Sequence, residues 1–243
     1  MPKKFRMFAG PNGSGKSTLI KEVRKSYNIG FFINADEIES ELKKKNFIEI
    51  SDYSNKILTQ SDWDEFLGKA DKNDLRFAGV FPVVLLKDNY LICKEELNSY
   101  HCSLIADFLR NKLLDQDQTF SFETVMSHDS KIEFLRTAKE KGFTTYLYFI
   151  CTQDPKINIQ RISNRVEKGG HDVNTKKAYD RYFRSLGLLF NAFILADRAF
   201  VIDSSNKSRE VVLEKNQNQI LVLKDIIPEW VDKYLLEKIE TEN

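Results

Sequence analysis

The chain has 243 residues, which is enough for one large α/β domain or for a core that carries an insertion. Its 37 lysines and arginines nearly balance its 36 aspartates and glutamates, so no global basic field draws it to nucleic acid or to a membrane, although a local patch is not excluded. Three scattered cysteines and no apolar run of membrane-spanning length favour free thiols in a cytoplasmic protein.

The first distinctive segment is a glycine-rich loop between an expected strand, 5–9, and an expected helix, 19–24. It matches G-x-x-x-x-G-K-[ST], the P-loop, whose backbone N–H groups surround phosphate oxygens. Lys16 would reach the β- and γ-phosphates and the Ser17 hydroxyl would bind Mg²⁺. A glycine-rich turn without a ligand is the alternative. The residues expected to contact the nucleotide are Gly10, Pro11, Asn12, Gly13, Ser14, Gly15, Lys16, Ser17 and Thr18.

Two acids follow expected strands. Asp36 starts a helix just after the short apolar run 31–33, and Glu123 ends the alternating segment 119–123. Because ligands of open α/β sheets bind beyond the carboxyl ends of the strands, both acids are expected on the rim that holds the P-loop. Asp36 could orient an acceptor hydroxyl and accept its proton, or it could simply cap its helix. Glu123 could hold Mg²⁺ through water, bind the acceptor, or have a structural role.

The remaining periodicities complete an alternating pattern. Residues 46–98 are expected to form an insertion, with a hairpin over 77–93. Strands alternating with helices predict an α/β fold of the P-loop NTPase, kinase-like kind, with three α/β/α layers around a mostly parallel sheet in a single domain. The other expected helices are 99–114, 130–141, 157–166, 175–196 and 228–239, and the other expected strands are 145–151, 200–203 and 219–223.

Region 157–196 carries repeated arginines and predicts a lid. Arg165 lies four residues after Arg161, and Arg181 and Arg184 follow a Gly-Gly-His segment that ends at His171. Such cations suit phosphoryl transfer, in which negative charge spreads over the γ-phosphoryl oxygens. A solvated basic helix face is the alternative for each arginine. His171 could contact phosphate or acceptor, or could simply begin a helix.

Missing motifs separate the classes of P-loop protein. A transporter-type ATPase needs an LSGGQ-like signature and an apolar strand ending in Asp-Glu, and the sequence has neither. A GTPase needs N-K-x-D for the guanine base, and both Asn-Lys pairs, at 111–112 and 206–207, lack the aspartate. Kinase chemistry on a small acceptor is the reading that remains.

Five blocks in this order resemble the zeta-toxin-like P-loop kinases. They are F-A-G-P-N-G-S-G-K-S-T (8–18), I-N-A-D-E-I (33–38), F-S-F-E-T (120–124), N-R-V-E-K-G-G-H-D-V (164–173) and R-Y-F-R-S-L (181–186). The resemblance covers residues 3–45 and about 99–205. It implies an enzyme that uses ATP and Mg²⁺ to phosphorylate UDP-N-acetylglucosamine on the 3′-hydroxyl of its amino sugar, and that a small antitoxin protein blocks at the ATP site.

The resemblance also implies roles for single residues. Lys16 and Ser17 match the phosphate lysine and the magnesium ligand, Asp36 matches the catalytic base, and Arg165 matches the first lid arginine. Glu123, with Thr124 beside it, matches the acceptor pocket.

Two positions depart from the family. The chain has His171 where a second lid arginine is expected and Val125 where a threonine is expected. Both departures concern the acceptor side, so the sugar-nucleotide substrate and toxicity do not follow from the resemblance, whereas ATP use does.

Two other functions compete with this interpretation. A polynucleotide or nucleotide kinase would have a basic groove beside the lid, for which Lys43, Lys44 and Lys45 and the insertion are the candidates. A non-catalytic binding module would move its lid or insertion when ATP binds.

Overall fold

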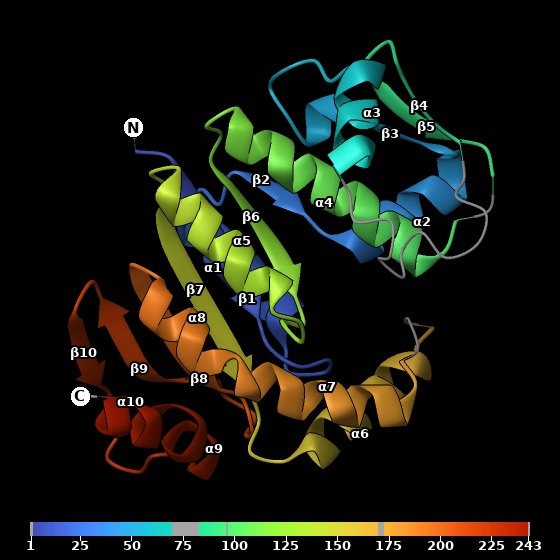
Figure 1. Cartoon of the computed structure of the whole chain (residues 1–243). Helices are drawn as coiled ribbons and strands as arrows, with labels where there is room; N and C mark the ends of the chain where they lie inside the picture. The colour runs from blue at the N-terminus through green and yellow to red at the C-terminus, as the bar shows by residue number, and fades with distance from the viewer. Residues whose placement is uncertain (1, 70–82, 96, 170–172, 243) are drawn as a thin grey trace. The chain divides into compact units, whose positions relative to one another are not determined.

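The structure is a computed structural model that describes residues 2–69, 83–95, 97–169 and 173–242 (Figure 1). The chain forms two compact units. The first contains residues 1–29 and 122–243, and the second contains residues 30–121. The expected insertion, 46–98, lies within the second unit.

The first unit is built on a mostly parallel sheet, as the sequence predicts. Its strands lie in the order β10-β9-β8-β7-β1-β6. Strands β1, β7 and β8 run parallel, whereas β9 and β10 add antiparallel pairs at one edge. The strands are β1 (Lys4–Ala9), β6 (Phe120–Thr124), β7 (Thr144–Cys151), β8 (Arg198–Asp203), β9 (Glu210–Asn216) and β10 (Gln219–Val222).

Helices flank this sheet, with α5 and α8 in front of it and α1 behind it in Figure 1. The expected helix 175–196 is two helices that meet at Leu188, and a π-helical stretch interrupts the expected helix 228–239. The helices of this unit are α1 (Lys16–Ser26), α5 (Ser130–Glu140), α6 (Pro155–Val166), α7 (Thr175–Gly187), α8 (Leu189–Leu195), α9 (Glu229–Val231) and α10 (Glu237–Glu242).

Aromatic residues form the core of the first unit. Phe5 stacks on Phe122, with ring centroids 5.4 Å apart, and contacts Phe134 of α5 edge-on. On the opposite face of β1, Phe8 stacks on Tyr148, whose other face stacks on Phe200. These rows join β6, β1, β7 and β8, the strands whose carboxyl ends carry the candidate site.

The second unit packs helices against a small sheet of its own. Strands β3, β5 and β4 are antiparallel in that order, and Asp88 and Asn89 join β4 to β5 with positive φ values of 51° and 68°. The expected hairpin is thus confirmed over 84–93, while residues 77–82 lie outside the described residues. The elements are β2 (Phe31–Ile33), α2 (Ala35–Lys45), β3 (Phe47–Glu49), a 3₁₀ turn (Ile50–Asp52), α3 (Gln60–Lys69), β4 (Val84–Lys87), β5 (Tyr90–Cys93) and α4 (Ser99–Asp115).

No helix within the described ranges combines the length and the apolar character that crossing a membrane requires.

A buried lysine closes the end of α8. The Lys215 ammonium donates hydrogen bonds to the carbonyls of Phe193, Ile194 and Ala196, at 2.9, 2.5 and 2.8 Å. Burial lowers the pKa of Lys215 to about 8, which keeps the side chain mainly protonated at neutral pH. All three donors are therefore matched to carbonyls that the helix leaves unpaired at its end.

We predict that Lys215→Met lowers the free energy of unfolding by about 1–3 kcal/mol, because three buried carbonyls lose their donor. Urea unfolding at pH 7 measures this difference. Lys139→Met is the matched control, since Lys139 also donates to a carbonyl of this helix but from a half-exposed position. Equal losses in the two variants would contradict the assigned role of Lys215.

An ion pair joins α3 to α4 in the second unit. Lys112 Nζ lies 2.7 Å from an Asp62 carboxylate oxygen, and the amide and hydroxyl of Thr59 donate to the same carboxylate. Partial burial opposes ionisation, but the hydrogen bonds from Lys112 and Thr59 outweigh it and hold the pKa of Asp62 at about 2.

This depressed pKa predicts a pH-dependent contribution to stability. It is fully present above the ordinary carboxyl pKa near 4 and is lost as the pH falls towards 2, because the unfolded chain takes up the proton first. Asp62→Asn should therefore destabilise the chain by about 1 kcal/mol at pH 6, and by progressively less as the pH falls to 3. Unfolding curves at both pH values test this, and a gap that widened at low pH would contradict it.

Candidate nucleotide-binding site

The P-loop joins the end of β1 to the start of α1, as the sequence predicts. All of β1 from Phe5 onward is buried, and α1 begins at Lys16 immediately after Gly15. Gly15 has a φ of 97°, in the left-handed region, and occupies the N-cap position. The loop thus opens at a helix N-terminus, where unpaired N–H groups and the helix dipole favour an anion.

Two loop positions can hold only glycine. A Cβ on Gly10 would collide with the carbonyl oxygen of Ile150, and one on Gly13 would lie 2.5 Å from the carbonyl oxygen of Asn158. Both residues also have positive φ values, of 140° and 78°. The glycines are therefore required because the loop backbone packs directly against β7 and α6.

Lys16 holds the loop closed. Its ammonium donates to the carbonyls of Gly10 and Pro11, at 2.8 and 2.9 Å, and lies 3.9 Å from a Glu123 carboxylate oxygen. The residue is only 6% exposed. A buried positive charge is thus fixed across the loop where a phosphate would be bound.

Ser17 and Glu123 lie together beside this lysine. The Ser17 hydroxyl contacts both carboxylate oxygens of Glu123, at 3.4 and 3.2 Å, although the two residues are 106 positions apart. Hydroxyl and carboxylate oxygens are ligands that Mg²⁺ prefers. The described residues contain no group of three or more His, Cys, Asp or Glu side chains that could hold a metal ion. These two residues therefore fit a magnesium ion that takes its other ligands from phosphate and water.

Asp36 belongs to the second unit, where it lies exposed in the first turn of α2. It is not the N-cap of this helix. Asn34 is, and its side-chain oxygen accepts a hydrogen bond from the Asp36 amide at 2.9 Å. The alternative of a capping acid is thus wrong, and the Asp36 carboxylate has no such local task.

Thr124 and the residues after it form a turn at the end of β6. The Thr124 hydroxyl accepts a hydrogen bond from the Met126 amide at 3.0 Å, and Met126 has a φ of 52°. The carbonyl of Val125 accepts a hydrogen bond from Ser185 at 2.8 Å. Within the described chain, the Thr124 side chain thus has a local structural partner, which competes with its expected contact to an acceptor.

The lid arginines divide into two groups. Arg161 and Arg165 line a cavity of about 420 Å³ together with Asn164, Lys168 and Gly169, all from α6 and the turn that follows it. The cavity is therefore strongly cationic.

The later arginines lie on α7. Arg181 is half-buried and Arg184 is exposed, with its Nε donating to the Asp180 carbonyl at 3.4 Å. His171 lies outside the described residues.

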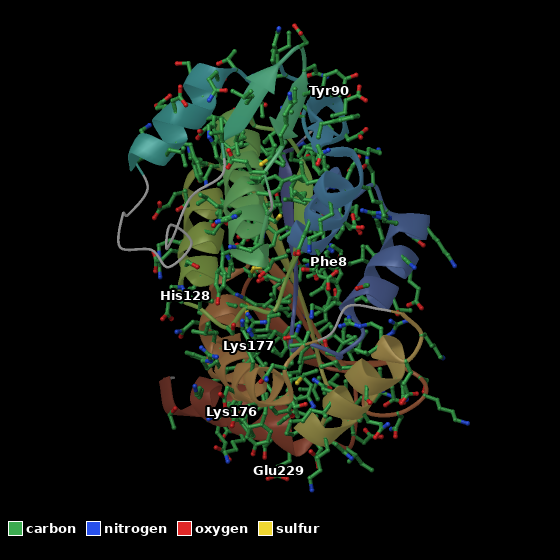
Figure 2. The ribbon with its side chains drawn as sticks, turned by 90° about the vertical axis from the view of Figure 1, so that its right-hand side faces the viewer. Phe8, Tyr90, His128, Lys176, Lys177 and Glu229 are labelled. Carbon is green, nitrogen blue, oxygen red and sulfur yellow. The ribbon has the colours of Figure 1, made fainter. Side chains whose placement is uncertain are left out.

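Two side chains of α7 form hydrogen bonds with backbone carbonyls just after strands β7 and β6. The Tyr182 hydroxyl donates to the Thr152 carbonyl at 2.5 Å, and Ser185 bonds the turn after β6. Both side chains are fully buried or nearly so. In the view of Figure 2, Lys176 and Lys177 mark the start of α7.

Sequence reasoning did not predict the contacts that the segment after β8 makes with the P-loop. The Ser204 hydroxyl donates to the Ser14 carbonyl at 2.7 Å, and Arg209 donates to the Gly15 carbonyl at 3.4 Å and pairs with Glu22. The strand ending at Asp203 placed these residues on the expected rim. Their contacts, however, join residues about 190 positions apart in the sequence, and no local sequence pattern predicts such contacts.

Comparisons with known proteins show the fold. No family model matches the chain. A Haemophilus influenzae protein described as uncharacterized is 42% identical over 54 residues, which are 22% of this chain and 39% of that protein.

Solved structures are similar over nearly the whole chain. The AvrRxo1-ORF1:AvrRxo1-ORF2 complex with sulphate ions has a TM-score of 0.58 at 14% identity, covering 93% of this chain and 62% of that one. The same complex with ATP gives 0.56 at 15% identity, covering 98% and 63%. The PezAT toxin-antitoxin system of Streptococcus pneumoniae gives 0.52 at 12% identity, covering 100% and 82%. The chain therefore shares the α/β fold of these proteins, with a mostly parallel sheet flanked by helices, as the sequence predicts.

Proposed function

We propose that this chain is an ATP- and Mg²⁺-dependent kinase that transfers the γ-phosphoryl group to a hydroxyl of a small acceptor. One observation carries the proposal. Lys16 and Ser17, adjacent in the P-loop, both meet Glu123, which the resemblance places in the acceptor pocket. A phosphate-binding cation, a metal-binding hydroxyl and an acid of the acceptor side thus occupy one place.

The residues of the P-loop would bind and orient the triphosphate. The loop N–H groups and the start of α1 would receive the phosphate oxygens, and Lys16 would stabilise the charge that develops on the transferred group. Because Lys16 is already fixed by two carbonyls, little reorganisation is needed when that charge appears.

Ser17 and Glu123 would hold the magnesium ion, Ser17 directly and Glu123 directly or through water. When bound, the ion neutralises charge on the β- and γ-phosphate oxygens. Glu123 is mostly buried, so its charge is weakly screened and its effect on a nearby cation is strong.

Asp36 would act as the general base. Its carboxylate is exposed and is not used as a helix cap, which leaves it available to accept a proton from an acceptor hydroxyl.

Arg165 would contact the γ-phosphoryl group from α6. It is exposed and lines the cationic cavity, whereas Arg161 is bound to Ser204. Because Tyr182 and Ser185 fasten α7, we place lid movement in the end of α6 and the turn after it.

The acceptor and partner follow from the resemblance. A sugar nucleotide such as UDP-N-acetylglucosamine is the first candidate acceptor, and a small antitoxin is the candidate partner. The PezAT structure is itself of a toxin-antitoxin system. The nucleic-acid alternative is weakened, because Lys43 pairs with Glu39 and Lys45 pairs with Glu41 along α2.

We predict that the wild-type chain, given ATP, Mg²⁺ and UDP-N-acetylglucosamine, forms a product heavier by one phosphate group, detected by mass spectrometry. Asp36→Asn should lower this rate about 10²–10⁴-fold with ATP affinity unchanged. Glu37→Gln, the next residue in the same helical turn, is the control and should keep the wild-type rate. A panel of nucleosides and oligonucleotides runs in parallel, and phosphorylation of an oligonucleotide alone would favour the polynucleotide kinase.

We predict that Glu123→Gln raises the Mg²⁺ concentration for half-maximal activity about tenfold or more, because the amide lacks the carboxylate charge. Activity measured over a magnesium titration at saturating ATP reports the shift. Glu133→Gln on the exposed face of α5 is the control. An unchanged magnesium requirement would remove Glu123 from the metal site.

A further inference from the structure

We propose that Ser204 is a positioning residue that holds the phosphate-binding loop in its binding conformation and links it to α6 through Arg161. This inference rests on the proposed nucleotide site and adds residues to it that the resemblance does not include. Ser204 follows β8 directly and is 2% exposed. It lies behind the loop, among the carboxyl ends of the parallel strands.

The Ser204 hydroxyl both donates and accepts hydrogen bonds. It donates to the Ser14 carbonyl at 2.7 Å, and its oxygen lies 3.3 Å from Nη1 of Arg161, which donates to it. The Ser204 amide donates to the Cys151 carbonyl at 2.8 Å, which fixes the residue to the end of β7. The same hydroxyl also lies 3.2 Å from the Cys151 carbonyl, a longer contact than the one to Ser14. It therefore joins the loop, the end of β7 and α6.

Holding the Ser14 carbonyl sets the direction of the next amide. In a trans peptide the C=O and the N–H that follow each other point in opposite directions. With the Ser14 carbonyl drawn back to Ser204, the Gly15 N–H is turned to the other side of the loop. This is the side on which successive N–H groups bind a phosphate.

The next carbonyl in the loop, that of Gly15, accepts the Leu19 amide of α1 at 3.1 Å and has a further donor in the segment after β8. Arg209 donates to the Gly15 carbonyl and pairs with Glu22 of α1, which places a second donor behind the loop. Two consecutive loop carbonyls therefore have partners in the segment after β8. Both partners lie outside the P-loop motif.

Arg161 extends this contact to α6. Its guanidinium donates through Nη2 to the Ser204 carbonyl at 2.7 Å and through Nη1 to the Ser204 hydroxyl. Arg165, one helical turn further along, lines the cationic cavity. A displacement of α6 would therefore pull on Ser204 and, through it, on the Ser14 carbonyl.

The experiment compares four chains. Isothermal titration measures the affinity of the wild type, Ser204→Ala, Ser204→Thr and Ser205→Ala for MgATP and for inorganic tripolyphosphate, and thermal unfolding checks that each folds. Ser205 is the matched control, since its hydroxyl bonds Asp203 and the Gln153 amide and not the loop. We expect Ser204→Ala to weaken both ligands about tenfold, Ser204→Thr to restore most of the affinity, and Ser205→Ala to change neither.

A second variant tests the link to α6. If Arg161 acts through Ser204, Arg161→Met should weaken tripolyphosphate binding, and the double variant with Ser204→Ala should be no weaker than the worse single variant. Fully additive losses would overturn the link. Should Ser204→Ala fail to fold, Arg161→Met alone still tests the inference.

Failure of the inference and failure of the proposed function give different results. Wild-type MgATP binding with an unaffected Ser204→Ala overturns the positioning role alone, as does a loss that Ser204→Thr does not restore. A wild-type chain that binds neither MgATP nor tripolyphosphate overturns both proposals.

Discussion

The buried ammonium of Lys16 is the constraint on which the candidate site depends. A charge that is only 6% exposed must be surrounded by acceptors, and the structure supplies two loop carbonyls and, at 3.9 Å, the Glu123 carboxylate. The loop can present those carbonyls only by packing tightly against its neighbours. This close packing explains why Gly10 and Gly13 lack room for a side chain. The buried charge of Lys16, the shape of the loop and the positions of its glycines therefore depend on one another.

The parallel strands bring the other parts of the site to this lysine. Because β1, β7 and β8 run in the same direction, their carboxyl ends lie at one edge, and segments far apart in the sequence begin their turns there. Glu123, near the end of β6, meets Ser17, and Ser204 after β8 meets the Ser14 carbonyl. A fold that creates this edge can be kept while most residues change. The similar structures share 12–15% identity with the chain.

Helices α6 and α7, which the sequence analysis treats as one lid, are attached to the sheet in different ways. The middle of α6 is bound to the segment after β8 through Arg161, and the exposed end of the helix carries Arg165 beside the cavity. The buried hydroxyls of Tyr182 and Ser185 bind α7 to the carbonyls of Thr152 and Val125. Arginines with similar helical spacing thus differ in burial and in their surroundings, since Arg161 is half-buried against Ser204 and Arg165 is exposed beside the cavity.

The sequence by itself determined the fold class, the P-loop and most strands and helices, because these follow from local periodicity and from a motif whose residues are neighbours. It also identified Glu123 as a candidate site residue, because this acid ends an alternating, strand-like segment. It did not predict the polar strand β9, and it read α7 and α8 as one helix, since neither feature has a strong local signal. The cap of α2, which is Asn34 rather than Asp36, is a local contact that the sequence reasoning overlooked. Only the tertiary structure decided that Ser204 donates to the Ser14 carbonyl and that Arg161 donates to Ser204. The two contacts of Ser204 join distant segments, which packing brings together and a local pattern does not contain.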